Sequence, residues 1–288
     1  MKKISSINSW PVIALAASLL FFALFPNFDL WVTGNFYDPE RGGFVYAHNG
    51  IVQFSYRLFS NMHWPVIWSI IAFWVAVRYL FNQQKRNHQI AAIYLLLALL
   101  LGPGLTVNSL FKSEWGRARP VNVTEFGGAR QYSPPLKPAS HCEYNCSFVS
   151  GHASMGFYFL SLAWIFNRKR WLVIGTTIGA TVGFGRILQG GHFFSDIVFA
   201  FWSVYLTCAL LAWLLNLPER LHTHAPTHTT PLKKRLIALI GVGTVVAIVY
   251  AGWAKEYIAT NRCLEAGGTY DVEHVVCVFD GAKAAASN

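Results

Sequence analysis

Residues 147–167 read S-F-V-S-G-H-A-S-M-G-F-Y-F-L-S-L-A-W-I-F-N, a short polar opening followed by an apolar run. A membrane-spanning helix needs about 20 predominantly apolar residues, and residues 149–167 form a run of this kind. The triplet Ser150-Gly151-His152 then lies at one edge of the membrane. Free backbone N–H groups in the first turn of a helix favour an anion. The stretch therefore predicts a membrane helix with an anion-binding position at its start.

Apolar runs of comparable length recur on both sides of this stretch. They lie approximately at 10–28, 64–82, 90–108, 171–189, 193–217 and 236–254. Of the 288 residues, 54% are hydrophobic and 12% are charged, which is too apolar for an ordinary soluble domain. We therefore predict an all-α membrane protein with seven spans, the first of them retained as an anchor.

Basic residues predict how the spans are oriented, because lysine and arginine collect on the cytoplasmic side. With the N-terminus in the cytoplasm, the cytoplasmic segments hold 12 of the 23 basic residues and one of the 13 acidic residues. Those basic residues are Lys2, Lys3, Arg78, Lys85, Arg86, Arg168, Lys169, Arg170, Arg220, Lys233, Lys234 and Arg235. The net charge of +10 is therefore a topology signal, and we expect no nucleic-acid partner.

The apolar runs also predict the domain organisation. Residues 1–217 form a membrane domain, 218–235 a polar cytoplasmic linker, 236–254 an extra span and 255–288 a short outer tail. Residues 29–63 and 109–148 are expected to be outer loops, because neither contains an apolar run long enough to cross a membrane.

Four of the five cysteines lie on the predicted outer side. Cys142 and Cys146 share one loop, and Cys263 and Cys277 share the tail, whereas Cys208 is alone in a span. Local pairs of this kind predict two disulfides in an oxidising compartment. The alternative is a zinc site formed by His141 with the first cysteine pair.

Three polar clusters interrupt the apolar pattern. They are K-S-E-W-G-R-A-R-P at 112–120, S-G-H at 150–152 and G-R-I-L-Q-G-G-H-F-F-S-D at 185–196. Alternating spans place all three at the outer face of the membrane. This convergence predicts one functional site built from three separate segments.

Cations and histidines in these clusters suit a phosphate group. Lys112, Arg119 and Arg186 offer the donors that phosphate oxygens accept. Arg117 is expected instead to extend toward lipid headgroups. For each of these three cations taken alone, the alternative is likewise a contact with lipid headgroups.

His192 and Asp196 are four residues apart at a helix start, which places them on one face. A carboxylate that holds one imidazole nitrogen leaves the other nucleophilic. His152 would face the bound anion and could donate a proton. A purely structural His–Asp pair is the alternative.

Together, these clusters resemble the type-2 phosphatidic acid phosphatase superfamily, whose pattern is K-x6-R-P, P-S-G-H and S-R-x5-H-x3-D. Lys112 to Pro120 matches the first block fully. Val149 replaces the proline of the second block, and Gly185 replaces the serine of the third. The resemblance covers roughly residues 95–215.

This resemblance implies a six-helix core, a reaction without metal or other cofactor, and a covalent phosphohistidine. It implies that His192 attacks phosphorus, that Asp196 orients His192, and that His152 protonates the leaving oxygen. The phosphoryl oxygens would be held by Lys112, Arg119, Ser150, the Gly151 amide and Arg186. Replacing His192 should abolish turnover without unfolding, because a histidine at a span edge contributes little to core packing.

The string N-C-S-F-V-S-G-H-A-S at 145–154 is also similar to bacterial lipid A phosphatases. That similarity implies a bacterial inner-membrane enzyme with its active site, and the tail, facing the periplasm. Lipid A, phosphatidylglycerol phosphate, phosphatidate and undecaprenyl pyrophosphate are candidate substrates. The loop 121–148 is the expected headgroup contact, with Arg130, Lys137 and His141 beside Tyr132 and Tyr144. Phosphotransfer to another lipid, or non-enzymatic lipid binding or transport, are the alternatives.

Overall fold

The computed structural model describes residues 10–80, 85–111, 115–143, 145–217, 221, 269–271 and 276–278. The chain forms two compact units, 1–228 and 229–288. In the second unit, β3 (Thr269–Asp271) pairs antiparallel with β4 (Val276–Val278). The predicted seventh span and Cys263 lie outside the described residues, as does almost all of the predicted linker.

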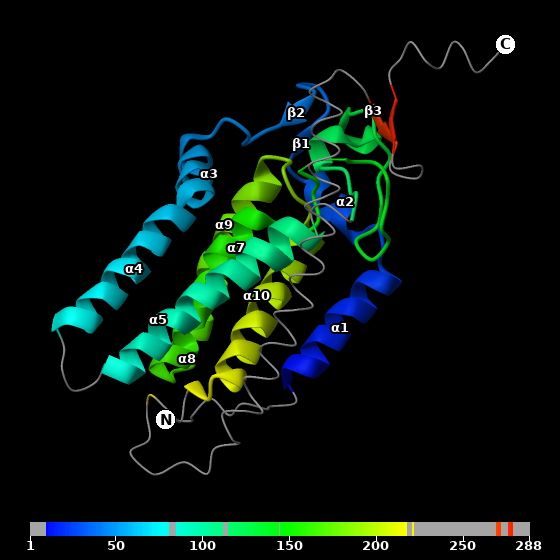
Figure 1. Ribbon diagram of the computed structural model, residues 1–288. Coiled ribbons are helices and arrows are strands. Elements are labelled where there is room, and N and C mark those ends of the chain that lie inside the picture. Colours follow the sequence, from blue (N-terminus) through cyan, green and yellow to red (C-terminus); the bar gives the residue numbers. More distant parts are fainter. Residues whose placement is uncertain are drawn as a thin grey trace. The chain divides into compact units, whose positions relative to one another are not determined.

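The first unit is built mainly from helices (Figure 1). Its N-terminal half contains α1 (Trp10–Leu24), α2 (Phe28–Gly34), α3 (Gly50–Asn61), α4 (His63–Leu80), α5 (Lys85–Leu99) and η1 (Leu100–Phe111). Its second half contains α7 (Gly151–Phe157), η4 (Tyr158–Ser161), α8 (Leu162–Phe166), α9 (Arg170–Leu188) and α10 (Phe194–Leu214). The short elements are the hairpin of β1 (Tyr37–Asp38) and β2 (Gly43–Phe44), and the 3₁₀ turns η2 (Pro120–Asn122) and η3 (Thr124–Phe126).

Several of these helices are long and apolar enough to cross a membrane. They are His88–Val107, Arg170–Leu188 and Phe194–Leu214. Two bent pairs also qualify if each crosses as one span: α1 with α2, bent by 83°, and α3 with α4, bent by 46°. The predicted span 149–167 is instead divided into α7, η4 and α8, with 7, 4 and 5 residues. The described residues thus form a multi-pass membrane protein, although its spans do not match the predicted runs one for one.

The segment 29–63 contains more regular structure than the loop predicted from the sequence. It folds into α2, the β1–β2 hairpin and α3. Asn49 caps α3, because its side chain accepts hydrogen bonds from the amides of Ile51 and Val52. A short amphipathic helix needs no 20-residue apolar run, which explains why the search for spans missed it. Helix α3 packs against α7 and α9.

Glycines let α7 and η4 lie close against α9. A Cβ atom on Gly179 would lie 2.1 Å from the ring of Phe157, and one on Gly156 would lie 2.7 Å from the Cα of Gly179. Gly175 and Gly183 continue the four-residue spacing on α9, and small residues at this spacing allow close approach of membrane helices. This packing fixes the start of α7 relative to the end of α9.

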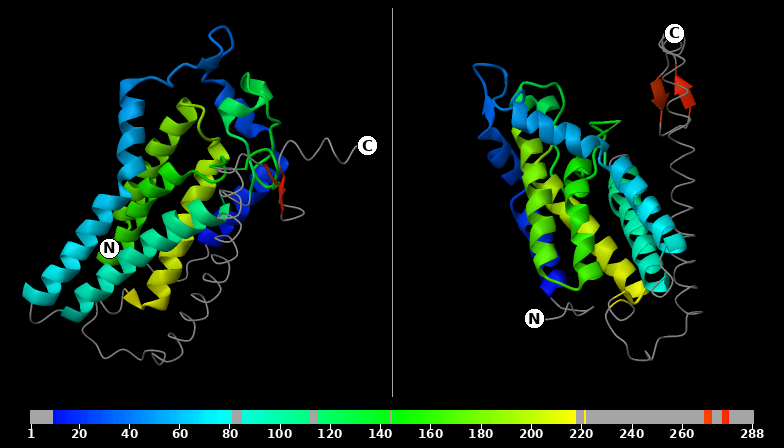
Figure 2. Two further views of the ribbon diagram at one scale, coloured as in Figure 1. Left: turned by 45° about the horizontal axis from the view of Figure 1, so that its top comes forward. Right: turned by 90° about the vertical axis from the view of Figure 1, so that its left-hand side faces the viewer.

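The core lies between α5, α7, α9 and α10, which Figure 2 shows running beside one another. Buried Tyr94, Leu160 and Trp202 belong to it. Large apolar side chains are also exposed, among them Trp10, Ile13, Trp64, Trp68 and Trp213. An exposed apolar belt around an apolar core is what a lipid environment favours.

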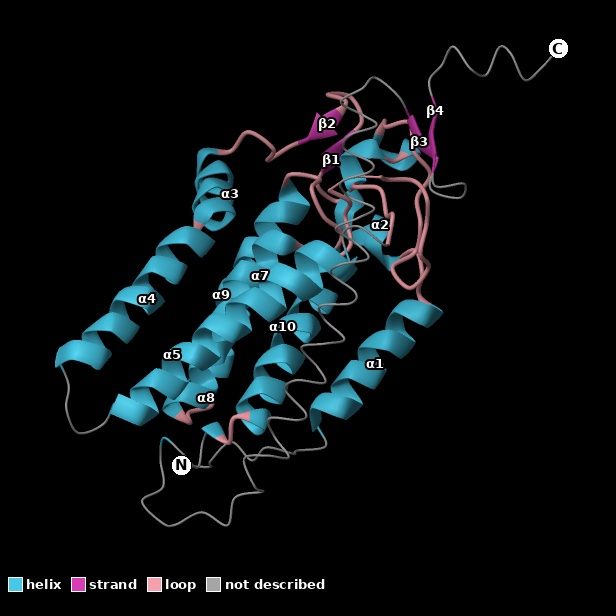
Figure 3. Ribbon diagram, viewed as in Figure 1, coloured by secondary structure: helices cyan, strands magenta, loops and turns pink. Residues whose placement is uncertain are grey.

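Loops gather at one end of these helices, where α9 ends and where α7 and α10 begin (Figure 3). The end of α4, the start of α5 and the α8–α9 junction lie at the opposite end. Helix α8 is followed by Asn167, whose left-handed conformation (φ 49°) is a common helix terminator. Arg168, Lys169 and Arg170 follow directly.

Candidate functional site

Backbone hydrogen bonds join the segments that carry the sequence motifs. The amide of Ser147 donates to the carbonyl of Arg117 (2.8 Å), and the amide of Ser150 donates to the carbonyl of Asp196 (3.1 Å). The amide of Gly191 donates to the carbonyl of Arg186 (2.9 Å). The three motif segments therefore meet as predicted. Lys112 lies outside the described residues.

His192 is fixed by the backbone carbonyl of Ser147. Its Nδ1 lies 2.8 Å from that oxygen. Because a carbonyl only accepts, Nδ1 must carry the proton, and in a neutral imidazole Nε2 then holds the lone pair. The expectation that His192 contributes little to packing was wrong, since the residue has no exposed surface and its ring contacts the Ser147 carbonyl.

Asp196 lies beside the same nitrogen but holds it less directly than the sequence suggested. Its Oδ2 is 3.5 Å from Nδ1 of His192, an ion-pair distance longer than an ordinary hydrogen bond. Oδ2 accepts from the hydroxyl of Ser147 (2.5 Å) and from the amide of Phe193 (2.8 Å), which caps α10. Asp196 thus fixes both Ser147, whose carbonyl holds His192, and the start of α10.

Arg117 completes this buried network. Its Nη1 donates to Asp196 (2.7 Å), its Nη2 to Asp29 (2.7 Å) and its Nε to the carbonyl of Ser133 (2.9 Å). The amide and hydroxyl of Ser195 also donate to Asp29. The guanidinium lies 4.3 Å from the ring centroid of Phe193. Arg117, Asp29 and Asp196 have no exposed surface.

The prediction that Arg117 reaches lipid headgroups was therefore wrong. Its ion-pair partner Asp29 is 88 residues away in sequence, so no local pattern revealed the pair. Burial alone would lower the pKa of the Arg117 guanidinium, but Asp196 and Asp29 outweigh that effect and raise the pKa. The group is therefore a permanent cation between two carboxylates.

Helix α3 positions His152. The Nε2 of His152 lies 2.8 Å from the hydroxyl of Ser60. The imidazole stacks on the ring of Tyr56, with 4.7 Å between centroids and 24° between planes. Tyr56 and Ser60 are four residues apart and share one helix face. This face fixes both the plane and one nitrogen of the imidazole.

Arg186 also lies over the ring of Tyr56. Its guanidinium carbon is 4.7 Å from the Tyr56 ring centroid, and it donates to the side chain of Gln189. A Cβ atom on Gly191 would lie 2.3 Å from Nη2 of Arg186. A side chain at position 191 would therefore displace the guanidinium, which lies against the residue that precedes His192.

Arg119 is held by the loop that precedes α7. Its Nε and Nη2 donate to the backbone and side-chain oxygens of Asn145, at 3.0 and 2.7 Å. Burial lowers the pKa of Arg119, and the nearby Tyr56 and Asp196 oppose that shift. A guanidinium has five N–H donors, so this pairing leaves others for a ligand.

Ser150 and Gly151 begin α7. The hydroxyl oxygen of Ser150 accepts a hydrogen bond from the amide of Ala153 (3.3 Å), so it caps the helix. A capping hydroxyl oxygen accepts and keeps its own proton to donate. Both residues are buried, and the Ser150 amide donates to the carbonyl of Asp196.

Cys142 and Cys146 form a disulfide with 5.6 Å between their Cα atoms. Because neither sulfur is then a thiolate, the alternative zinc site with His141 is excluded. Within the described ranges, no group of three or more His, Cys, Asp or Glu residues is arranged to hold a metal. Cys277 lies in β4, and Cys208 is a buried free thiol.

Sequence reasoning missed the residues that support the site. These are Asp29, Ser60, Ser147, Ser195 and Tyr56, together with the buried role of Arg117. Asp29 follows an apolar run, and an ionisable residue at a span edge is a functional candidate by default. The serines carry no local signal.

Comparison with known proteins supports the assignment of these segments. The family model described as the PAP2 superfamily matches residues 91–221. A lipid A 4′-phosphatase of Francisella tularensis subsp. novicida is 38% identical over 198 residues, which are 65% of this chain and 86% of that protein.

Two further relatives named lipid A 4′-phosphatase come from Rhizobium. Those of Rhizobium leguminosarum and Rhizobium etli are 29% and 30% identical over 213 residues, or 68% of this chain and 90% and 82% of theirs. No solved structure matches the chain. The family that the sequence motifs indicate is confirmed: the chain belongs to the PAP2 superfamily.

Proposed function

We propose that this protein is an integral-membrane phosphatase that hydrolyses a phosphate monoester on the headgroup of lipid A. The observation that carries the proposal is the hydrogen bond from His192 Nδ1 to the Ser147 carbonyl, which leaves Nε2 as the nucleophilic atom. The three relatives named lipid A 4′-phosphatase support the choice of lipid.

In the first step, Nε2 of His192 attacks phosphorus. An N–P bond forms and the P–O bond to the lipid breaks, while His152 donates a proton to the leaving oxygen. The histidine that carries the phosphoryl group is cationic, because Nδ1 keeps its proton. The carboxylate of Asp196, whose Oδ2 lies 3.5 Å from Nδ1, stabilises this cation.

In the second step, water attacks the phosphorus of the phosphohistidine. His152 takes a proton from that water, the N–P bond breaks, and inorganic phosphate leaves. His192 returns to its starting form and His152 is again protonated. The two histidines therefore close the cycle without a further reactant.

Arg119 and Arg186 hold the phosphoryl oxygens in both steps, with Lys112, Ser150 and the Gly151 amide as further donors. Positioning and charge stabilisation supply most of the catalysis in phosphoryl transfer. Because side chains of this chain handle every proton and charge in the two steps, we propose that the reaction is metal-independent.

We further propose that the site faces the periplasm from the inner membrane. The basic segments at the end of α4, the start of α5 and the α8–α9 junction lie at the end opposite the site (Figure 1). Basic residues favour the cytoplasmic side. The Cys142–Cys146 disulfide, at the site end, suits an oxidising compartment.

Phosphate release by the detergent-purified protein tests this proposal. We expect release from lipid A in the presence of EDTA, and much less from phosphatidate, phosphatidylglycerol phosphate and undecaprenyl pyrophosphate. Equal release from all four would contradict the choice of substrate. Loss of release with EDTA would contradict the metal-independent mechanism. Loss of phosphate from lipid A only when an acceptor lipid is added, with the phosphate recovered on that acceptor, would favour phosphotransfer.

Ser60→Ala tests the placement of His152 by α3. Losing one hydrogen bond of about 1 kcal/mol should lower kcat by roughly 5-fold and leave KM unchanged. Ser69→Ala is the matched control, because the Ser69 hydroxyl bonds only the Pro65 carbonyl within α4 among the described contacts. Equal kcat values in the two variants would remove Ser60 from the mechanism.

A further inference from the structure

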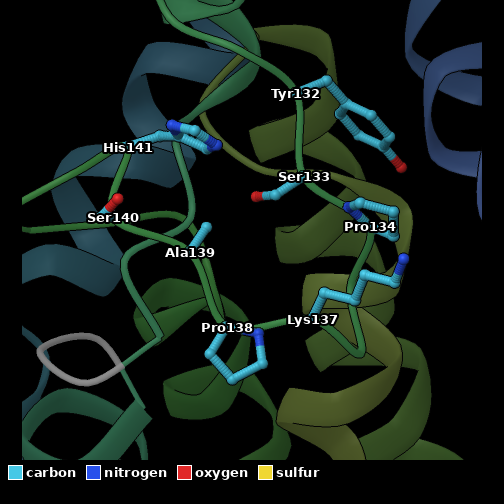
Figure 4. Close-up of a pocket in the computed structure, with 8 residues that line it drawn as sticks. All are labelled: Tyr132, Ser133, Pro134, Lys137, Pro138, Ala139, Ser140 and His141. Atoms are coloured by element: carbon cyan, nitrogen blue, oxygen red, sulfur yellow. The ribbon is translucent and has the colours of Figure 1, made fainter.

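A cavity that is open to solvent lies in the loop between η3 and α7. Its volume is about 530 Å³, within the range of small-molecule sites. It is lined by Tyr132, Ser133, Pro134, Lys137, Pro138, Ala139, Ser140 and His141 (Figure 4). None of these residues belongs to the sequence motifs of the family.

Ser133 gives this cavity an unused hydrogen-bonding group. Its side chain is 94% buried, since its exposed fraction is 6%. Its hydroxyl has no hydrogen-bond partner among the described residues. Figure 4 shows the hydroxyl turned into the cavity toward His141. Leaving a buried hydroxyl unbonded costs about 1–3 kcal/mol, so its presence points to a ligand.

The two ends of the cavity differ in chemistry. Ser133 and His141 supply hydrogen-bonding groups on one side, and Lys137 is the cation among the lining residues. In Figure 4 its side chain runs away from Ser133 and His141, and its ammonium appears near Pro134. Pro134 and Pro138 form apolar walls between polar groups. A sugar ring has both apolar faces and hydroxyl edges, and an attached anionic group would pair with the ammonium.

Two connections join the cavity to the catalytic residues. The carbonyl of Ser133 accepts from Arg117, whose Nη1 binds Asp196. On the other wall, His141 directly precedes Cys142, whose disulfide with Cys146 closes the short loop that holds Asn145. Asn145 is the partner of Arg119.

We propose that this cavity binds a second phosphorylated sugar of the same lipid headgroup, while the phosphate to be cleaved lies at His192. The inference rests on the proposed function and deepens it. The cavity then sets substrate preference. It contributes to the binding of an anionic glycolipid, and it makes no contact with a lipid whose headgroup is one small phosphate.

Two lipids test this directly: lipid A with both of its phosphates, and the same lipid with the phosphate to be cleaved as its only phosphate. For wild type, kcat/KM should be about 10-fold higher on the first. Lys137→Met should remove this preference. Lys169→Met is the matched control, because Lys169 is an exposed lysine at the N-terminal end of α9. This variant should keep the preference for the bisphosphorylated lipid.

Ser133→Ala separates ligand binding from folding. Because the hydroxyl is buried and unbonded, its removal should not lower the unfolding temperature. It should nevertheless lower kcat/KM about 5-fold on both glycolipids, since both present the sugar. A lower unfolding temperature with unchanged kcat/KM would show that the hydroxyl is structural and would overturn the proposal.

Other outcomes also decide the matter. Equal kcat/KM values of wild type on the two lipids, or equal losses on both in Lys137→Met, would contradict a second phosphate site. Added inorganic phosphate should inhibit wild type and Lys137→Met to the same extent on the monophosphorylated lipid. Inhibition that depends on Lys137 would identify a site for free phosphate instead.

Failure of the proposed function gives a different result. Wild type would then release no phosphate from either lipid. The same pair then serves in an equilibrium binding measurement on wild type, where the cavity predicts about 10-fold tighter binding of the bisphosphorylated lipid. Equal affinities there would overturn the inference.

Discussion

His192→Asn is expected to reduce phosphate release by at least about 10³-fold while the protein stays folded. The amide nitrogen of asparagine can occupy the place of Nδ1 and donate to the Ser147 carbonyl, as the imidazole does at 2.8 Å. The substitution removes the nucleophilic nitrogen and keeps the hydrogen bond that organises the loop. The measurements are phosphate release from lipid A and thermal unfolding in detergent.

His192→Ala is the informative partner of this variant. It should be equally inactive but less stable by about 1–3 kcal/mol, because the buried Ser147 carbonyl loses its donor and a cavity is left. Loss of activity in both variants with loss of stability in only one separates chemistry from folding. Residual activity of His192→Asn within 10-fold of wild type would exclude His192 as the nucleophile.

Arg117→Met is expected to have the largest effect on stability. It leaves Asp29 and Asp196 buried without their shared cation, and breaking a buried ion pair in this way costs about 3–5 kcal/mol. We expect a sharp fall in the unfolding temperature in detergent. Arg117→Lys should not rescue it, because one ammonium cannot replace a planar fork that reaches five acceptors.

Two controls make the Arg117 result specific. Arg41→Met removes an exposed ion pair with Asp38 and should cost less than about 1 kcal/mol. Asp29→Asn combined with Arg117→Met removes one charge of each sign, so the double variant should be more stable than the sum of the single effects predicts. An unfolding temperature of Arg117→Met equal to that of Arg41→Met would show that the network does not support the fold.

The sequence predicted those parts of the site that depend on spacing within one segment. His192 and Asp196 are four residues apart, and Arg186 lies six residues before His192, so the turn from the end of α9 to the start of α10 brings them together. The long apolar runs likewise predicted α9 and α10, because lipid-exposed helices must be continuous and apolar.

The rest depends on contacts between distant segments, which single-sequence patterns do not contain. Asp29 and Arg117 pair across 88 residues, and Ser60 and His152 across 92. Arg117 stands two residues from Arg119, yet one is fully buried and the other partly exposed. Burial, and therefore role, is decided by the partner and not by the residue type.

Identification of the phosphoenzyme tests the central claim most directly. The protein is incubated with lipid A labelled in the phosphate to be cleaved, quenched in alkaline detergent within the first turnover, and digested for mass spectrometry. We predict an acid-labile phosphoryl group on His192 in wild type, and none at residue 192 in His192→Asn. A phosphoryl group on any other residue, or one that survives acid as a phosphoserine does, would contradict the phosphohistidine mechanism.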